Sequence, residues 1–177
     1  MDEVLRFGSW KYDLYLGLLL FARAMDFLST WIATPTLLLE ANPLARVLRW
    51  KWGMTVNVVL CLAFAFLPLT AIIISTTSVL VAARNFQLAW LMRTHGEENY
   101  RNWFVERMEE TPPGLFLFCL MSQTSLTAAV GGALMYFSNW QELVPLGIGL
   151  GIIGYAMAVL IFTFLALWRN RRAMNYK

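Results

Sequence analysis

Charged residues, histidine and cysteine are all scarce in this sequence of 177 residues. Only 14% of the residues are charged and 59% are hydrophobic, whereas soluble domains carry about 25% charged residues. This composition excludes an ordinary soluble domain and predicts an integral membrane protein. The net charge is only +3, and the basic residues cluster where membrane topology places them, so we expect no nucleic-acid partner.

The shortage of metal-binding side chains excludes several classes of cofactor. His95 is the only histidine, so haem held by paired histidines is excluded and a histidine-based zinc site is not expected. Cys61 and Cys119 fall at different depths of two apolar stretches, which argues against a disulfide. The sequence has no Gly-rich phosphate loop, nucleophile elbow or Ser/His/Asp set. We therefore expect no cofactor, no metal and no catalytic residue, and a non-enzymatic protein is favoured over an enzyme.

Long apolar runs are what the sequence has in abundance. They predict an all-α integral membrane protein with a single domain, 1–177, and four transmembrane helices at about 14–34, 54–83, 115–137 and 143–168. The second run is too long for a straight crossing, because its ~30 residues would reach ~45 Å against a hydrocarbon core of ~30 Å. It must tilt, kink at Pro68 or project beyond the membrane. The intervening segments are predicted as an interfacial loop, 35–53, and a cytoplasmic amphipathic helix within 84–113.

The lysine and arginine residues predict the orientation in the membrane. With four spans, ten of them share the side of both termini: Arg6, Lys11, Arg84, Arg93, Arg101, Arg107, Arg169, Arg171, Arg172 and Lys177. Three fall on the other side: Arg46, Arg49 and Lys51. The excess predicts a multi-pass protein of the cytoplasmic (inner) membrane with both termini in the cytoplasm.

The first predicted span contains two charged residues at membrane depth. Arg23 and Asp26 lie three residues apart and Thr30 follows one turn later, so the three side chains share one stripe of a helix. Each charge costs at least ~2.5–3.5 kcal/mol at that depth, which favours a polar site that faces the bundle interior or a water-filled cavity. Two interpretations stay open: a functional pair, or a structural salt bridge that orients helices.

The predicted interfacial loop carries a second polar group. Glu40 and Asn42 precede Pro43 among several leucines, and polar side chains in such surroundings need partners. We expect Glu40 or Asn42 to lie within reach of the stripe formed by Asp26 and Thr30, with Thr30 nearest. Alternatively, Asn42 only caps a short helix that starts after Pro43. A third possibility is a hard cation held by Asp26, Glu40 and Asn42.

The string Asp26–Thr30 (DFLST), followed about ten residues later by Glu40–Leu44 (EANPL) and then Gly53, resembles a family of small bacterial and archaeal membrane proteins of unknown function. The likeness covers roughly residues 14–83. It implies a shared polar site in a prokaryotic membrane protein and brings no activity with it. Such proteins often carry a basic residue early in the second span, where this chain has Asn57, so compensation of Asp26 is left to Arg23.

Aromatic residues mark the segment 84–113 as a surface for the membrane or for a partner. Thr94 and Glu97 have capping-box spacing, which predicts a helix from about His95 to Glu110. The residues expected at this surface are Trp90, Tyr100, Trp103 and Phe104. The segment either lies on the inner leaflet or docks a partner subunit, and its five glutamates argue against a simple anchor to anionic lipid.

Polar and small residues in the last two predicted spans indicate helix packing. Gln123 needs a hydrogen-bond partner, because an unsatisfied amide in lipid is costly. Close helix approach is predicted at Gly147, Gly151 and Gly154, either within the molecule, through Gly131 and Gly132, or in an oligomer of unknown size.

Three function classes remain after the sequence analysis. The favoured one is a non-enzymatic accessory or structural subunit that binds partner helices or membrane lipid. The second is a small transport or proton/ion-handling protein that uses Arg23, Asp26, Glu40 and Asn42. The third is a membrane-embedded enzyme that acts on a lipid. A water-accessible cavity at Asp26 would favour the second or third class, and a closed pair with Arg23 would favour the first.

Overall fold

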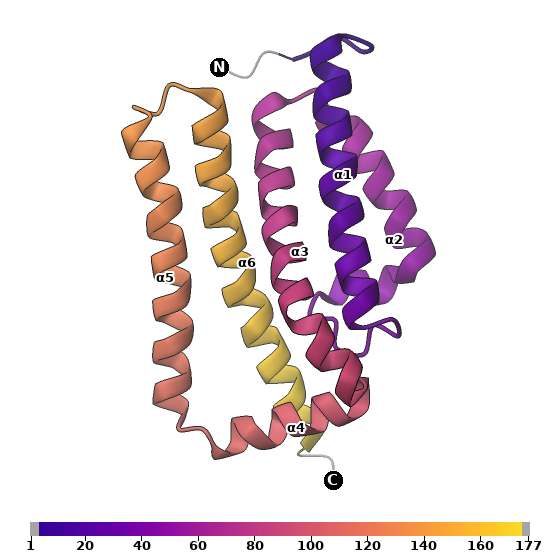
Figure 1. Ribbon diagram of the computed structural model, residues 1–177, viewed down its shortest axis with the longest axis vertical. Coiled ribbons are helices and arrows are strands. Elements are labelled where there is room, and N and C mark those ends of the chain that lie inside the picture. Colours follow the sequence, from indigo (N-terminus) through magenta and orange to yellow (C-terminus); the bar gives the residue numbers. More distant parts are fainter. Residues whose placement is uncertain (1–3, 175–177) are drawn as a thin grey trace.

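The structure is a computed structural model that describes residues 4–174, with side chains described as far as residue 167. Over this range it is all-helical, as predicted (Figure 1). Its helices are α1 (Trp10–Ala33), α2 (Pro43–Phe64), α3 (Pro68–His95), α4 (Glu97–Glu110), α5 (Pro113–Phe137) and α6 (Leu143–Met174). All of them except α4 are long and apolar enough to cross a membrane. The side chains of Arg169, Arg171 and Arg172, and the whole of Lys177, lie outside the described part.

The predicted span 54–83 is not one helix in the structure. The chain reverses between Phe64 and Pro68, so five membrane-type helices take the place of the four expected. Pro68 begins α3, where the missing N–H and fixed φ of proline suit the first helical turn. The apolar pattern did not reveal this turn because the residues on both sides of it are equally apolar.

The connecting segments also differ from the prediction. Helix α2 starts at Pro43 and takes in much of the predicted interfacial loop 35–53, although it is kinked at Arg49, where φ is 55°. Helix α3 continues to His95 and takes in the first part of the predicted segment 84–113. Helix α4 begins at Glu97 with Gly96 at its N-cap, and Thr94 instead donates to the Trp90 carbonyl at 2.8 Å. The capping box is therefore absent.

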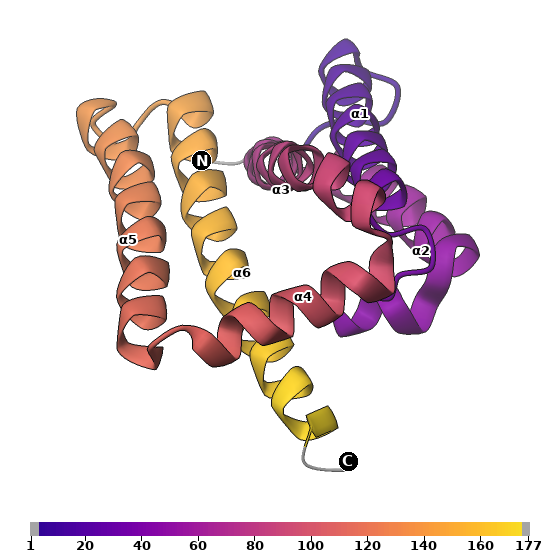
Figure 2. The same cartoon turned by 60° about the horizontal axis from the view of Figure 1, so that its bottom comes forward.

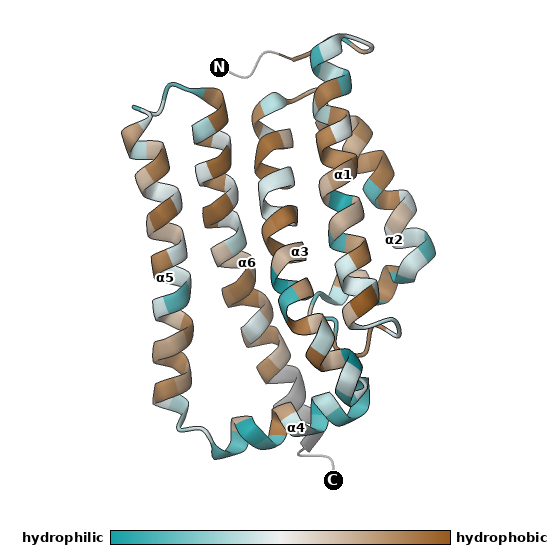
Figure 3. Ribbon diagram, viewed as in Figure 1, coloured by the Kyte–Doolittle hydropathy of each residue, from teal (hydrophilic) through white to brown (hydrophobic). Residues whose placement is uncertain are grey.

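Helix α3 is the centre of the arrangement. It packs against α1 on one side and against α6 on the other, and α5 pairs with α6. In Figure 1, α1, α3 and α6 run in one direction and α2 and α5 in the other. Helix α4 crosses the end of the bundle where α3 ends and α5 begins (Figure 2). Figure 3 shows that polar residues dominate α4, whereas the long helices are mostly apolar.

Glycines allow the close approach of α6 to both of its neighbours. A Cβ at Gly147 would meet Ile72 Cβ at 2.8 Å, and one at Gly151 would meet Thr76 Cβ at 2.6 Å, both on α3. Thr77 donates to the Gly151 carbonyl at 2.9 Å, and Gly154 faces the same threonine. The predicted packing glycines therefore lie mainly against α3, which the sequence analysis did not anticipate.

The hairpin of α5 and α6 uses a different pair of glycines. A Cβ at Gly131 would lie 2.6 Å from the Gly149 carbonyl oxygen, whereas one at Gly132 would meet nothing within 4 Å. Gly131 thus contacts α6 as expected, and Gly132 does not.

Candidate functional site

Arg23 joins three helices at the centre of a polar cluster. On α1 itself its Nη1 atom lies 2.9 Å from Asp26 Oδ2. Its Nε atom donates to Asn57 Oδ1 of α2 at 2.6 Å, and Nη1 also donates to Ser78 Oγ of α3 at 3.0 Å. The side chains of Arg23 and Asp26 are only 29% and 18% exposed. Arg23 and Asp26 therefore form the ion pair within α1 that the sequence suggested. Arg23 also links α1 to α2 and α3, and we call this set of contacts the clamp.

A second set of polar contacts continues the cluster one turn along α1. Ser29 is fully buried and donates to the Asp26 carbonyl at 2.9 Å. Asn85 of α3 donates to Thr30 Oγ1 at 3.2 Å and lies 3.4 Å from Ser29 Oγ. Thr30 thus finds its partner on α3.

The residues of α3 in this cluster were missed by the sequence analysis. A signal for them exists, since one stripe of α3 carries small and polar residues at alternating spacings of three and four: Ser75, Ser78, Ala82, Asn85 and Ala89. All five lie on the side of α3 that is buried or partly buried. Ser75 is 3% exposed, and its hydroxyl has no partner in the described part of the chain.

Glu40 and Asn42 are joined to each other at the start of α2. Asn42 is the N-cap of α2, with its side chain accepting from the Leu44 N–H at 3.0 Å, and Glu40 accepts from the Asn42 N–H at 2.7 Å. The capping alternative therefore describes Asn42.

Glu97 of α4 makes several hydrogen bonds to the connection between α1 and α2. Its carboxylate accepts from the Thr34 hydroxyl at 2.5 Å, from the Thr36 hydroxyl and N–H at 2.6 and 3.0 Å, and from the Leu38 N–H at 3.3 Å. Partial burial disfavours its charge, but these donors outweigh burial and lower the pKa of Glu97. The sequence analysis had given Glu97 only a capping role.

The predicted aromatic surface is divided between two helices. Tyr100 is 8% exposed and its ring lies beside those of Trp103 and Phe104, at centroid distances of 5.7 and 6.4 Å. Burial raises the pKa of Tyr100, against the opposing effect of the nearby Arg84. Trp90 lies on α3 and is 68% exposed. Only Tyr100 of α4 is buried, so most of this helix is available to a membrane or a partner.

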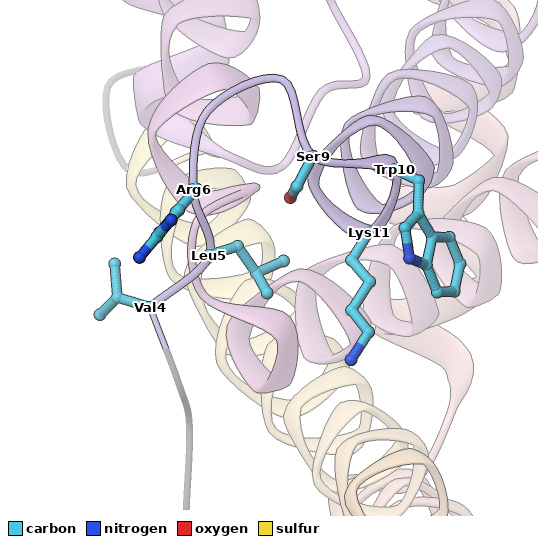
Figure 4. Close-up of a pocket in the computed structure, with 6 residues that line it drawn as sticks. All are labelled: Val4, Leu5, Arg6, Ser9, Trp10 and Lys11. Atoms are coloured by element: carbon cyan, nitrogen blue, oxygen red, sulfur yellow. The ribbon is translucent and has the colours of Figure 1, made fainter.

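A shallow pocket lies where α1 begins, at the end of the bundle opposite to α4 (Figure 4). It is lined by Val4, Leu5, Arg6, Ser9, Trp10 and Lys11. Ser9 is the N-cap of α1, and Lys11 lies 6.0 Å from the Trp10 ring centroid. All six residues come from one short segment, and none belongs to the polar cluster.

The described residues contain no group of three or more His, Cys, Asp or Glu side chains placed to hold a metal ion. His95 is exposed, and its Nδ1 atom lies 3.1 Å from the Leu91 carbonyl oxygen of its own helix. The polar cluster itself is a hydrogen-bonded ion pair, with Arg23 joined to Asp26, Asn57 and Ser78. No protein-family model matches the chain, and no curated protein or solved structure is significantly similar to it.

Proposed function

We propose that this chain is a non-enzymatic multi-pass membrane protein that serves as an accessory or structural subunit. The observation that supports this most is the closed cluster around Arg23, whose guanidinium bonds to side chains of α1, α2 and α3 at once. A charge that bonds to side chains of neighbouring helices is suited to fixing their arrangement. The resemblance of residues 14–83 to a prokaryotic family is retained as part of this proposal.

The exposed face of α5 has features that favour the binding of a partner helix. Gln123 is exposed in the middle of this apolar helix, and its amide makes no hydrogen bond to the residues that the structure describes. An amide in hydrocarbon gains from a partner across a helix interface. Large apolar side chains accompany it on the exposed surface of α5, among them Phe118, Met121, Leu126 and Val130. Partner helices or lipid would cover this surface.

We further propose that five helices cross the membrane, with the start of α1 outside and the end of α6 in the cytoplasm. Of the lysines and arginines in 4–174, Arg6 and Lys11 lie at the end of the bundle where α1 begins. The opposite half carries Arg46, Arg49, Lys51, Arg84, Arg93, Arg101, Arg107, Arg169, Arg171 and Arg172. This distribution favours a cytoplasmic location for α4. Both termini would be cytoplasmic only if α2 turned back without crossing.

Purification in a mild detergent followed by native mass spectrometry tests the proposed role. We expect a stoichiometric protein partner that dissociates when Gln123→Leu is introduced, while Gln87→Leu, an exposed glutamine on α3, leaves the complex intact. A chain that is monomeric and carries no bound lipid would contradict the proposal.

A second candidate, proton or ion handling, is favoured by polar groups at successive levels of α1. Arg23 bonds to Ser78, Thr30 accepts from Asn85 and Thr34 bonds to Glu97, and the buried Ser75 hydroxyl has no partner in the described part of the chain. Proton flux into liposomes that is abolished by Asp26→Asn would favour this candidate over the subunit role.

A further inference from the structure

The connection between α1 and α2 presents four hydrogen-bond donors to a single carboxylate. Glu97 Oε2 accepts from Thr34 Oγ1, Thr36 Oγ1 and the Leu38 N–H, and Oε1 accepts from the Thr36 N–H, all between 2.5 and 3.3 Å. No lysine or arginine of the described residues pairs with this carboxylate. The charge is therefore held by backbone and hydroxyl dipoles, as in the concave backbone sites that bind anions.

The donor loop has internal contacts that do not involve Glu97. The Leu37 N–H donates to the Thr34 carbonyl at 3.0 Å, and the Leu39 N–H donates to Thr34 Oγ1 at 3.2 Å. Trp50 of α2 donates to the Pro35 carbonyl at 2.9 Å from outside the loop. Leu37 is held at a positive φ of 61°, which turns the chain so that donors on either side face the same point. Contacts of the loop with itself and with α2 thus help to hold the donors in place.

Glu97 reaches this loop from the first position of α4, a helix in which one residue is buried. Gly96 connects α3 to α4 with φ 77° and ψ 153°, a conformation accessible to glycine, and a Cβ there would meet no atom within 4 Å. Within α4 only Tyr100 is buried. Glu97 is therefore an intramolecular ligand of the loop, joined to α3 through the single residue Gly96.

We propose that Thr34–Leu38 is a receptor for a phosphate-class oxyanion, occupied by Glu97 in this state, and that such an anion competes with Glu97 for the loop. A phosphate offers several strong acceptor oxygens, which match hydroxyl and amide donors. Thr36 is exposed, so an anion can reach the loop. Basic residues of α2 and α4 lie in the same half of the molecule, among them Arg46, Arg49 and Arg101. Exchange of the anion would release α4 from the loop.

Thermal unfolding of the detergent-solubilised full chain tests this proposal. Glu97→Ala removes the tethered competitor, so its apparent affinity for sodium phosphate should rise by at least about tenfold over wild type. Sodium chloride at equal ionic strength controls for screening, and Glu98→Ala, a change at the exposed neighbouring carboxylate, should behave as wild type. Adding Thr36→Val to Glu97→Ala should weaken the phosphate response, because valine lacks the hydroxyl donor of Thr36 but keeps its N–H.

A second experiment distinguishes a lipid headgroup from a soluble phosphate as the source of the anion. The same variants are reconstituted into phosphatidylcholine bilayers with or without phosphatidic acid. Stabilisation by phosphatidic acid alone assigns the site to a lipid headgroup, and stabilisation by phosphate alone assigns it to a soluble phosphate. Equal phosphate response in Glu97→Ala and wild type, together with no effect of phosphatidic acid, would overturn the proposal. If Glu97→Ala does not fold, Glu97→Gln takes its place, and the same equality overturns the proposal.

Discussion

Arg23 Nε donates to Asn57 Oδ1 at 2.6 Å, so the guanidinium that holds Asp26 also attaches α2 to α1. The amide is oriented for this contact because Asn57 Nδ2 donates to the Gly53 carbonyl at 2.7 Å on its own helix. A basic residue at position 57, which the family resemblance suggested, would place a second positive charge against Arg23. Because the Asn57 side chain is an uncharged acceptor, Arg23 can bond to Asp26 on α1 and to Asn57 on α2 at the same time.

Replacing Asn57 should loosen α2. We expect Asn57→Leu to lower the free energy of unfolding by about 1 kcal/mol, the usual size of one hydrogen bond between membrane helices. Thr55→Val is the matched control, because the Thr55 hydroxyl bonds only to the Lys51 carbonyl of its own helix. Equal thermal stability of the two variants in detergent would argue against the Asn57 contact.

Breaking the buried pair should cost more than breaking an exposed one. Arg23→Ala or Asp26→Ala leaves an uncompensated charge, so each should destabilise the protein by about 3 kcal/mol. The matched control is Arg107→Ala, which breaks the exposed Arg107–Glu110 pair of the same spacing at 2.7 Å and should cost under about 1 kcal/mol. The double change Arg23→Met/Asp26→Leu should recover much of the loss in thermal unfolding. Wild-type stability in both single variants would contradict the clamp.

Two adjacent glycines of α5 should respond differently to alanine. Gly131→Ala introduces a Cβ 2.6 Å from the Gly149 carbonyl oxygen, which should separate α5 from α6 at a cost of about 1–3 kcal/mol. Gly132→Ala enters open space and should be neutral or stabilising by up to about 1 kcal/mol, because alanine favours the helix. A thermal shift assay of both variants provides the comparison, and similar melting temperatures would disagree with this helix contact.

Cysteine labelling distinguishes the five-span from the four-span topology. In a background without Cys61 and Cys119, single cysteines at Phe7 and Trp140 should react with an impermeant reagent applied outside intact cells. Cysteines at Val47 and Asn102 should stay protected until the membrane is opened. The four-span arrangement would instead expose position 47 and protect position 7, so these two positions decide the matter.

The Glu97 contact should make stability depend on acid pH. The pKa of Glu97 is lowered in the folded protein, so its stabilising effect is fully present above the ordinary glutamate pKa of about 4.3 and is lost as the pH falls through the lower folded value. The difference in melting temperature between wild type and Glu97→Gln should therefore shrink in that acid range. Glu98→Gln controls for the general effect of acid, and a difference that is independent of pH would contradict the contribution of the charge.

Composition and local sequence pattern were enough to predict a membrane environment and the ends of several helices. Apolar runs without charges predicted the last two long helices closely, because a helix in lipid must satisfy its backbone internally and span a known thickness. Asn42 followed by Pro43 was enough to predict where α2 starts, because helix capping depends only on neighbouring residues. The spacing of Arg23 and Asp26 was enough to predict their pairing on one helix face.

Only the tertiary structure decided the direction of the chain and the partners of its polar groups. Apolar composition reports contact with lipid and carries no information on whether the chain continues or reverses, so the turn between α2 and α3 was hidden in a uniform stretch. Arg23 meets Asn57 and Ser78, and Glu97 meets Thr34, across separations of 34 to 63 residues. Helical periodicity relates residues within a few turns, and contacts over such separations depend on how whole helices pack.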